Sequence, residues 1–126
     1  MADLDPYSLP VEGGAYALYF DIRAPVVLRI PRFENPHLDP STYVYAGSAY
    51  GPGGIRARVA RHLREEKTLH WNVDHVSAQV RCSRVETYPK GRECDLIADL
   101  LVNGADIPIP GFGNSDCRAC VSHLVR

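Results

Sequence analysis

The sequence predicts a small α+β domain in which a central mixed or antiparallel β-sheet is flanked by helices. Residues 14–22 alternate with a period of two, which is typical of a strand. Two later segments, 55–66 and 91–102, carry apolar residues along one helical face. The length of 126 residues and the hydrophobic content of 45% suit one compact domain with one core.

The first half of the chain is predicted to form three strands. The alternation at 14–22 gives the first strand. Pro25 ends it, and residues 26–30 are predicted to form a second strand that makes a hairpin with the first. Residues 31–40 contain three prolines and are predicted to be a loop. The β-branched and aromatic residues of 42–46 predict the third strand.

The second half is predicted to contain two helices and a second pair of strands. Residues 47–54 hold four glycines and predict a turn that leads into the helix at 55–66. Apolar side chains recur at every fourth position of this helix and form its buried stripe. Short strands are predicted at 76–80 and 84–88, and a helix at 91–102 follows them.

Residues 1–126 are predicted to form a single domain, with a loose N-terminal segment at 1–12 and a cysteine-containing tail at 105–126. Residues 1–10 lack a basic segment followed by an apolar one, so a secretory signal is not expected. No apolar run approaches the roughly 20 residues that cross a bilayer, so no membrane association is expected. The expected location is cytoplasmic.

Positive charge is concentrated in one helix of an otherwise near-neutral chain. The net charge is −1, whereas proteins that bind nucleic acid without sequence preference usually carry a basic surplus. Helical geometry places Arg58 and His62 beside the apolar stripe of the helix, and Arg56, Arg61 and Arg64 toward solvent. The exposed set is either a nucleic-acid-binding face or an ordinary solvated helix surface.

Five side chains would suit phosphodiester hydrolysis if the fold brings them together. They are two phenols, a guanidinium, an imidazole and a carboxylate: Tyr16, Tyr45, Arg58, His62 and Glu93. A carboxylate holds Mg²⁺, an arginine neutralises a phosphate, and a phenol or imidazole moves the proton of an attacking water. Each residue also has a purely structural interpretation, because tyrosines are common in strand cores and acids are common in first helical turns.

The order of these residues resembles the GIY-YIG nuclease superfamily. The resemblance rests on Gly-Ala-Tyr at 14–16, Tyr-Ala-Gly at 45–47, Ile-Arg-Ala-Arg at 55–58 and the later Glu93, and it covers about residues 13–103. A closer resemblance, to a small stand-alone subfamily of poorly defined activity, rests on further short matches. These are residues 53–58, Leu-His-Trp at 69–71, Glu93-Cys94 and the tail segment 111–117. Members of that subfamily are sometimes fused to DNA-repair glycosylase domains.

The resemblance implies a role for each of the five residues. Tyr16 would be the general base or would position the attacking water, and Tyr45 would support the nucleophile and the phosphate. Arg58 would stabilise the pentacoordinate state, and His62 would assist as a base. Glu93 would hold one divalent ion, Mg²⁺ or Mn²⁺. Two departures are that Ser48 and Ala49 follow the second motif, where many members have lysine or glutamine, and that only Asn114 is a candidate for the family's late asparagine.

The function implied is a divalent-metal-dependent endonuclease that acts on DNA, related to repair or to DNA structure. A partner protein would supply targeting. Nucleic-acid contacts are expected from Arg56, Arg61, Arg64 and His70. Two alternatives remain open: a non-catalytic nucleic-acid-binding module with the same fold, and a zinc-stabilised interaction domain.

Two further groups of residues keep alternative interpretations. Around the only tryptophan, His70 or Asp74 is expected to line the cleft, and Trp71 is either a core residue or a base-stacking platform. In the tail, Cys117, Cys120 and His123 have ligand-type spacing, and Cys94 or Cys82 could complete a tetrahedral zinc site. Buried, reduced thiols are the alternative.

Overall fold

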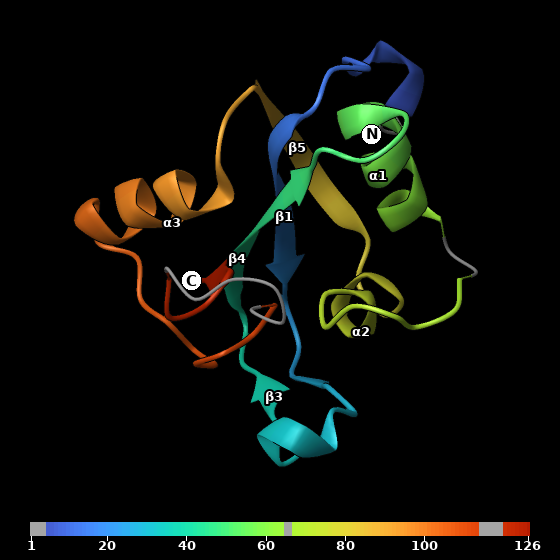
Figure 1. Ribbon diagram of the computed structural model, residues 1–126. Coiled ribbons are helices and arrows are strands. Elements are labelled where there is room, and N and C mark those ends of the chain that lie inside the picture. The colour runs from blue at the N-terminus through green and yellow to red at the C-terminus, as the bar shows by residue number, and fades with distance from the viewer. Residues whose placement is uncertain (1–4, 65–66, 114–119) are drawn as a thin grey trace.

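The computed structural model describes residues 5–64, 67–113 and 120–126 and has the predicted α+β architecture. A four-stranded antiparallel sheet in the order β5-β1-β4-β6 forms its centre (Figure 1). The elements are η1 (Pro6–Ser8), β1 (Gly14–Ile22), β2 (Val26–Val27), η2 (Pro31–Phe33), β3 (His37–Leu38), β4 (Ser41–Ala49), α1 (Gly54–Leu63), α2 (Asp74–Ser77), β5 (Cys82–Pro89), α3 (Glu93–Val102) and β6 (Leu124–Val125). Within the described residues, none of the helices has the length and apolar character needed to cross a membrane.

Two long central strands carry the two glycine- and tyrosine-containing motifs side by side. β1 pairs with β4 along its whole length, from Gly14 opposite Ala49 to Ile22 opposite Ser41. This register places Tyr16 opposite Gly47. A Cβ added at Gly47 would overlap the Tyr16 ring, so glycine is needed there for the ring to lie across the neighbouring strand.

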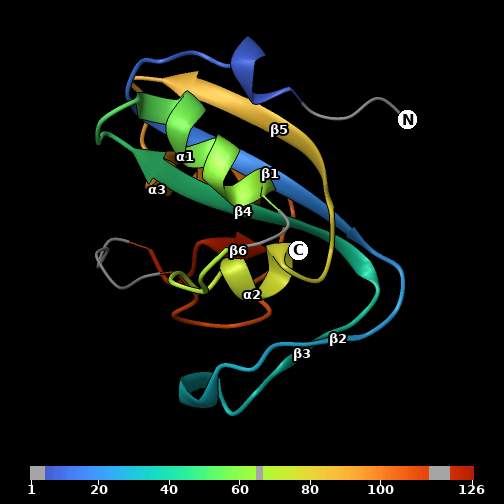
Figure 2. The ribbon, with the colours of Figure 1, turned by 90° about the vertical axis from the view of Figure 1, so that its right-hand side faces the viewer.

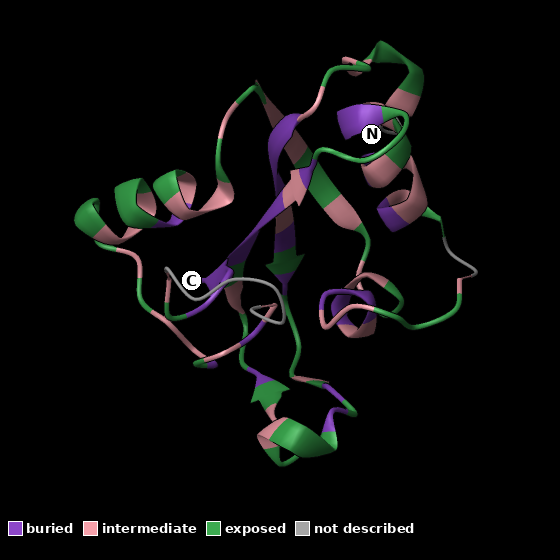
Figure 3. Ribbon diagram, in the orientation of Figure 1, coloured by how far each residue is buried: buried purple, intermediate pink, exposed green. Residues whose placement is uncertain are grey.

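The two faces of the sheet are covered by different helices. α1 lies over one face and α3 over the other (Figure 1), and the strands between them are the most buried part of the molecule (Figure 3). The alternating side chains of β1 are divided accordingly, because Tyr16, Leu18 and Phe20 belong to the core under α1. Ala17 belongs to the smaller core under α3, together with Ile97 of that helix.

Two of the predicted strands form different structures. Residues 26–30 do not pair with β1, because β4 and β5 occupy both of its edges. Instead β2 pairs with β3 in a separate two-stranded ribbon that extends away from the main sheet (Figure 2). Residues 76–80 are not a strand either, because Asp74–Ser77 form the short helix α2, whose Val76 packs into the core.

The start of α1 is tied to the chain that precedes β1. The backbone N–H groups of Ile55 and Arg56 donate to the carbonyl oxygens of Glu12 and Pro10, at 2.9 Å each. Residues 9–12 are therefore held against the helix, rather than forming the end of a loose lead-in. Because these first-turn donors are already satisfied within the protein, the glycine-rich turn before α1 does not offer them to a bound anion.

Candidate active site

Four of the five predicted catalytic side chains converge on the sheet face under α1. Tyr16 comes from β1, Tyr45 from β4, and Arg58 and His62 from α1. The ring centroids of Tyr16 and His62 are 5.6 Å apart, those of Tyr45 and His62 6.2 Å, and those of the two tyrosines 6.4 Å. Adjacent strands and the helix that crosses them thus bring residues 46 positions apart into contact.

A chain of polar contacts runs inward from Tyr16. Its hydroxyl lies 2.8 Å from Nε2 of His62, and Nδ1 of His62 lies 3.6 Å from Oδ1 of Asp74. Nδ1 makes no hydrogen bond within the described residues, but an ionised carboxylate is only a hydrogen-bond acceptor, so the nearby Asp74 favours the His62 tautomer that carries its hydrogen on Nδ1. In that tautomer Nε2 accepts the hydrogen bond that the Tyr16 hydroxyl donates.

The Asp74 carboxylate is fully buried and has several donors. Arg61 donates to both of its oxygens, at 2.9 Å each. The backbone N–H groups of His70 and Trp71 donate to Oδ2 at 2.8 and 2.9 Å. Burial alone would raise the pKa of Asp74, but the nearby His62 imidazole and the hydrogen bonds from Arg61 and the two N–H groups outweigh it and hold the pKa well below the usual carboxyl range.

Burial also sets the protonation states of the aromatic groups. It raises the pKa of Tyr16 well above the usual range, and the neighbouring Tyr45 raises it further against the opposing effect of Arg58. The pKa of Tyr45 is raised by burial too. Burial lowers the pKa of His62 although the nearby Asp74 carboxylate opposes this shift. At neutral pH the cluster therefore contains two neutral phenols, a neutral imidazole and an ionised carboxylate.

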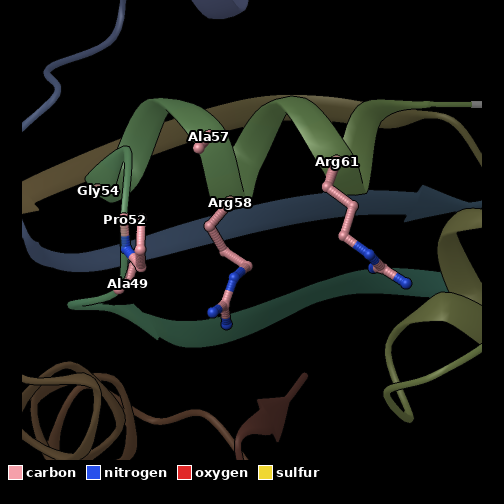
Figure 4. Close-up of a pocket in the computed structure, with 7 residues that line it drawn as sticks. Ala49, Pro52, Gly54, Ala57, Arg58 and Arg61 are labelled. Carbon is pink, nitrogen blue, oxygen red and sulfur yellow. The ribbon is translucent and has the colours of Figure 1, made fainter.

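An arginine-lined pocket adjoins this cluster. Arg58 and Arg61 leave α1 on the same side and point toward β4 (Figure 4), and together with the glycine-rich turn they line a pocket of about 130 Å³. Both guanidinium carbons lie over the ring of Trp71, at 4.5 and 4.3 Å from its centroid. Arg58 also donates to the carbonyl oxygen of Ser48 at 3.3 Å. The charge of Arg61 is balanced by Asp74, so Arg58 is the positive group that suits this pocket to an anion such as a phosphate.

Glu93 approaches the cluster from the other side of the fold. It is the first residue of α3, where the positive end of the helix dipole favours an ionised carboxylate. Glu93 affects the cluster electrostatically, through the pKa of Tyr45. Burial is the main cause of the raised pKa of Tyr45, and the carboxylates of Asp74 and Glu93 add to the shift. No hydrogen bond joins Glu93 to Tyr16, Arg58 or His62 in the described part of the chain.

The four residues predicted to contact nucleic acid have different surroundings. The expectation that Arg56, Arg61 and Arg64 all point to solvent is wrong, because only Arg64 is exposed. Arg56 is half-buried and its Nε donates to the carbonyl oxygen of Leu9 at 2.9 Å. Arg61 is committed to Asp74, because the stripe of α1 turns it toward α2 rather than outward. Arg64 is exposed, and so is His70, whose ring lies 4.8 Å from that of Trp71.

The cysteine-containing tail brings three possible metal ligands together. The Sγ atoms of Cys94 and Cys120 and an imidazole nitrogen of His123 all lie within 4.8 Å of one another. Cys82 is at the start of β5, opposite Phe20 of β1, and is not part of this group. Cys117 and Asn114, the other predicted tail residues, lie outside the described residues.

Asp74 is the residue of the cluster whose contacts the sequence did not reveal. It was expected only as a residue lining the cleft, yet it is the buried partner of both His62 and Arg61. A carboxylate at the start of a short helix is a common sequence feature. Its partners lie 12 and 13 residues earlier in a different helix, so helical or strand spacing alone does not reveal the contact.

The fold and the site define a small α+β domain with a buried tyrosine–histidine–aspartate chain beside an arginine-lined pocket. The chain belongs to the family described as "Domain of unknown function DUF123", whose model matches residues 15–126. That match includes every residue of the cluster. No curated protein and no solved structure matches the chain.

Proposed function

We propose that this protein is a GIY-YIG-type endonuclease that hydrolyses phosphodiester bonds in DNA, in repair or at DNA of unusual structure. The observation that carries the proposal is the contact chain from Tyr16 through His62 to Asp74, next to Arg58. The tripeptides that resemble the GIY-YIG motifs lie opposite each other on β1 and β4, which supports the same assignment.

Tyr16 acts in this proposal as a proton relay rather than as a preformed phenolate. Because its pKa is raised by burial, the phenol keeps its proton in the resting protein. An attacking water passes its proton to the Tyr16 oxygen while the Tyr16 hydroxyl passes its own proton to Nε2 of His62. Asp74 then stabilises the imidazolium that forms, in the way that a buried carboxylate supports histidine in other proton-transfer sites.

Arg58 neutralises the charge that develops on the phosphate. It lines the pocket, and a single 3.3 Å hydrogen bond to Ser48 and the contact with Trp71 hold its side chain in place. Tyr16 is only 1% exposed, so a substrate must displace a side chain to reach its hydroxyl. Arg58 is the side chain proposed to move, because it is half-buried beside Tyr16 and no ion pair holds it among the described residues, whereas Arg61 is fixed to Asp74.

The proposed cofactor is one Mg²⁺ or Mn²⁺ ion held by Glu93. One carboxylate completed by water and substrate phosphate oxygens is a usual Mg²⁺ environment, so the residue present fits this ion. When bound, the ion stabilises negative charge on the leaving oxygen. The thiol and imidazole cluster of the tail does not suit Mg²⁺, since hard cations prefer oxygen ligands, and Zn²⁺ is the ion that suits it.

Cleavage of a labelled DNA panel tests the proposal. Single-stranded, duplex, flap and branched DNA would be incubated with Mn²⁺ or with EDTA. We expect metal-dependent product that falls about 100-fold or more in Tyr16→Phe, Arg58→Ala and Glu93→Gln. Tyr43→Phe and Glu34→Gln are matched controls, because Tyr43 is a buried tyrosine bonded to the Asp39 carbonyl and Glu34 is exposed.

The second candidate function is a nucleic-acid-binding module without turnover. The burial of Tyr16 and His62, at 1% and 2% exposed, favours it, because buried groups are not poised for a substrate. Binding of the same DNA panel with no product under any metal condition would select this alternative. Salt-sensitive binding weakened by Arg64→Ala would then identify the exposed arginine as a phosphate contact.

A further inference from the structure

A second cluster of reactive side chains lies under α3, apart from the candidate active site. Cys94 lies in the first turn of α3, Cys120 lies shortly before β6, and His123 immediately precedes β6. Cys94 is 26 positions away from Cys120 in the sequence, yet the ligand atoms of all three residues lie within 4.8 Å of one another. The pairing of β6 with β4 holds this end of the chain in place, since the Ala46 N–H donates to the His123 carbonyl oxygen at 2.9 Å.

The spacing of the two sulfur atoms has two chemical interpretations. They are 2.9 Å apart, which lies between a disulfide bond of about 2.05 Å and the roughly 3.7 Å expected for two thiolates at tetrahedral angles on one zinc ion. A shift of less than about 1 Å would produce either arrangement. The sulfur distance alone therefore does not choose between a bound ion and a disulfide.

The buried histidine favours the ion. His123 is only 4% exposed, and its Nε2 has no hydrogen-bond partner among the described residues. A buried polar atom without a hydrogen-bond partner destabilises the folded protein. A disulfide would leave the imidazole nitrogen without a partner, whereas both sulfur atoms and the imidazole can bind one metal ion. Two cysteines and one histidine, with water in the fourth position, are an established zinc ligand set.

We propose that Cys94, Cys120 and His123 bind one zinc ion that fastens the beginning of α3 to the strand pair β4–β6. Zinc suits the set because thiolate and imidazole are its preferred ligands, and Mg²⁺ and Ca²⁺ prefer oxygen. Glu93 is the residue next to Cys94, and Tyr45 lies on β4 opposite Leu124 of β6. The ion would thus fix the position of Glu93, a consequence that rests on the proposed nuclease function, whereas zinc binding itself does not.

Zinc content per chain tests the site without using nuclease activity. The full chain would be purified from zinc-supplemented cells without chelators, and its zinc measured by plasma mass spectrometry. We expect about one ion per chain in the wild type and near-complete loss in Cys94→Ser and Cys120→Ser. Cys82→Ser is the matched control and should retain the ion, because Cys82 lies outside the cluster.

Cobalt substitution provides a second measurement if a serine variant folds poorly. Co²⁺ added to the metal-free wild type should give the intense absorption of tetrahedral thiolate ligation, Cys82→Ser should match it, and His123→Ala should lose it. Substoichiometric zinc in the wild type with a Cys94–Cys120 disulfide by mass spectrometry would overturn the proposal. So would equal zinc content in Cys94→Ser and Cys82→Ser. A wild-type protein that contains zinc but cleaves none of the DNA substrates would contradict the nuclease proposal and leave the zinc site supported.

Discussion

The two faces of the central sheet use the same strands for different purposes. Under α1 the strands present large aromatic rings, including Tyr16 and Tyr45, and the buried Asp74 carboxylate pairs with the partly exposed Arg61. Under α3 the same strands present Ala17 and Ala46, against which Ile97 packs. Alternation along a strand makes this division possible, because the neighbours of each tyrosine point to the opposite face.

The comparison explains the small residues inside the two tripeptide motifs. Ala46 is fully buried and belongs to the core under α3, so a small side chain there lets the helix lie close to β4. Tyr45 and Gly47 on either side of it serve the α1 face, one with its ring and the other by making room for Tyr16. One tripeptide thus meets the packing needs of both faces. Substitutions on each face should therefore have different consequences.

The largest effect is expected from Asp74→Asn, which removes the charge at the centre of the α1 face. Arg61 and His62 would lose a buried, ionised partner, and breaking such a pair costs about 3–5 kcal/mol of unfolding free energy. Urea denaturation at pH 7 measures the loss. Asp106→Asn is the matched control, because Asp106 pairs with Arg126 on the surface and its removal should change stability little. Equal effects of the two variants would contradict a special role for Asp74.

A smaller effect is expected from Gly47→Ala, which adds one methyl group on the α1 face. The new Cβ would overlap the Tyr16 ring and push its hydroxyl away from His62. Overpacking of this kind costs about 1–3 kcal/mol, and DNA cleavage should fall with it if Tyr16 relays the proton. Gly51→Ala provides the control, since a Cβ there meets no atom within 4 Å. A Gly47→Ala protein with wild-type stability and activity would show that the ring position is unimportant.

The pH dependence of stability should report on His62. Its pKa is lowered in the folded protein from the ordinary value of 6.5, so the unfolded chain takes up this proton at higher pH. The contribution of His62 to the free energy of unfolding is fully present above pH 6.5 and is lost as the pH falls through the pKa of the folded state. The free energy of unfolding should change by at most about 1.4 kcal/mol per pH unit in this range. Denaturation curves between pH 8 and about pH 5 measure this slope. His62→Gln should remove it, and the exposed His37→Gln should leave it unchanged.

The smallest effect is expected from Ile97→Val on the α3 face. Removal of one buried methyl group should reduce stability by about 0.5–1.5 kcal/mol, because the core under α3 is apolar packing. Thermal or urea unfolding would measure this loss. Cleavage per folded molecule should stay the same, in contrast to the variants of the α1 face. A large loss of activity at unchanged stability would mean that the two faces are more tightly coupled than their cores suggest.

The sequence predicted those elements whose signal is contained within one segment. The alternation of 14–22 and the apolar stripes of the two long helices were confirmed in β1, α1 and α3. Residues 26–30 also have strand character, but their partner depends on which strands already occupy the edges of β1. β6, with only two residues, is defined by its pairing to β4, which no local pattern can predict.

The candidate site divides in the same way. Tyr16, Tyr45, Arg58 and His62 were chosen because their order resembles the GIY-YIG motifs, and each lies on a regular element that the sequence predicts. The contacts of Arg61 and Asp74 depend on how α2 packs against α1 after an irregular segment, so this ion pair was not predictable. Glu93 could be placed at a helix start, but its distance from the other residues depends on the turn after β5.

The bonds between α1 and residues 9–12 define where an autonomous fragment of this protein can begin. Ile55 and Arg56 donate their amides to Glu12 and Pro10, and the Arg56 side chain donates to Leu9. A truncated chain beginning at Gly13 would keep every residue of the site and still lose the strap that holds the first turn of α1. Expression fragments should therefore begin before Leu9, and fusion junctions should lie before it as well. Deleting or displacing residues 9–12 would remove hydrogen bonds from the first turn of the helix that carries Arg58 and His62.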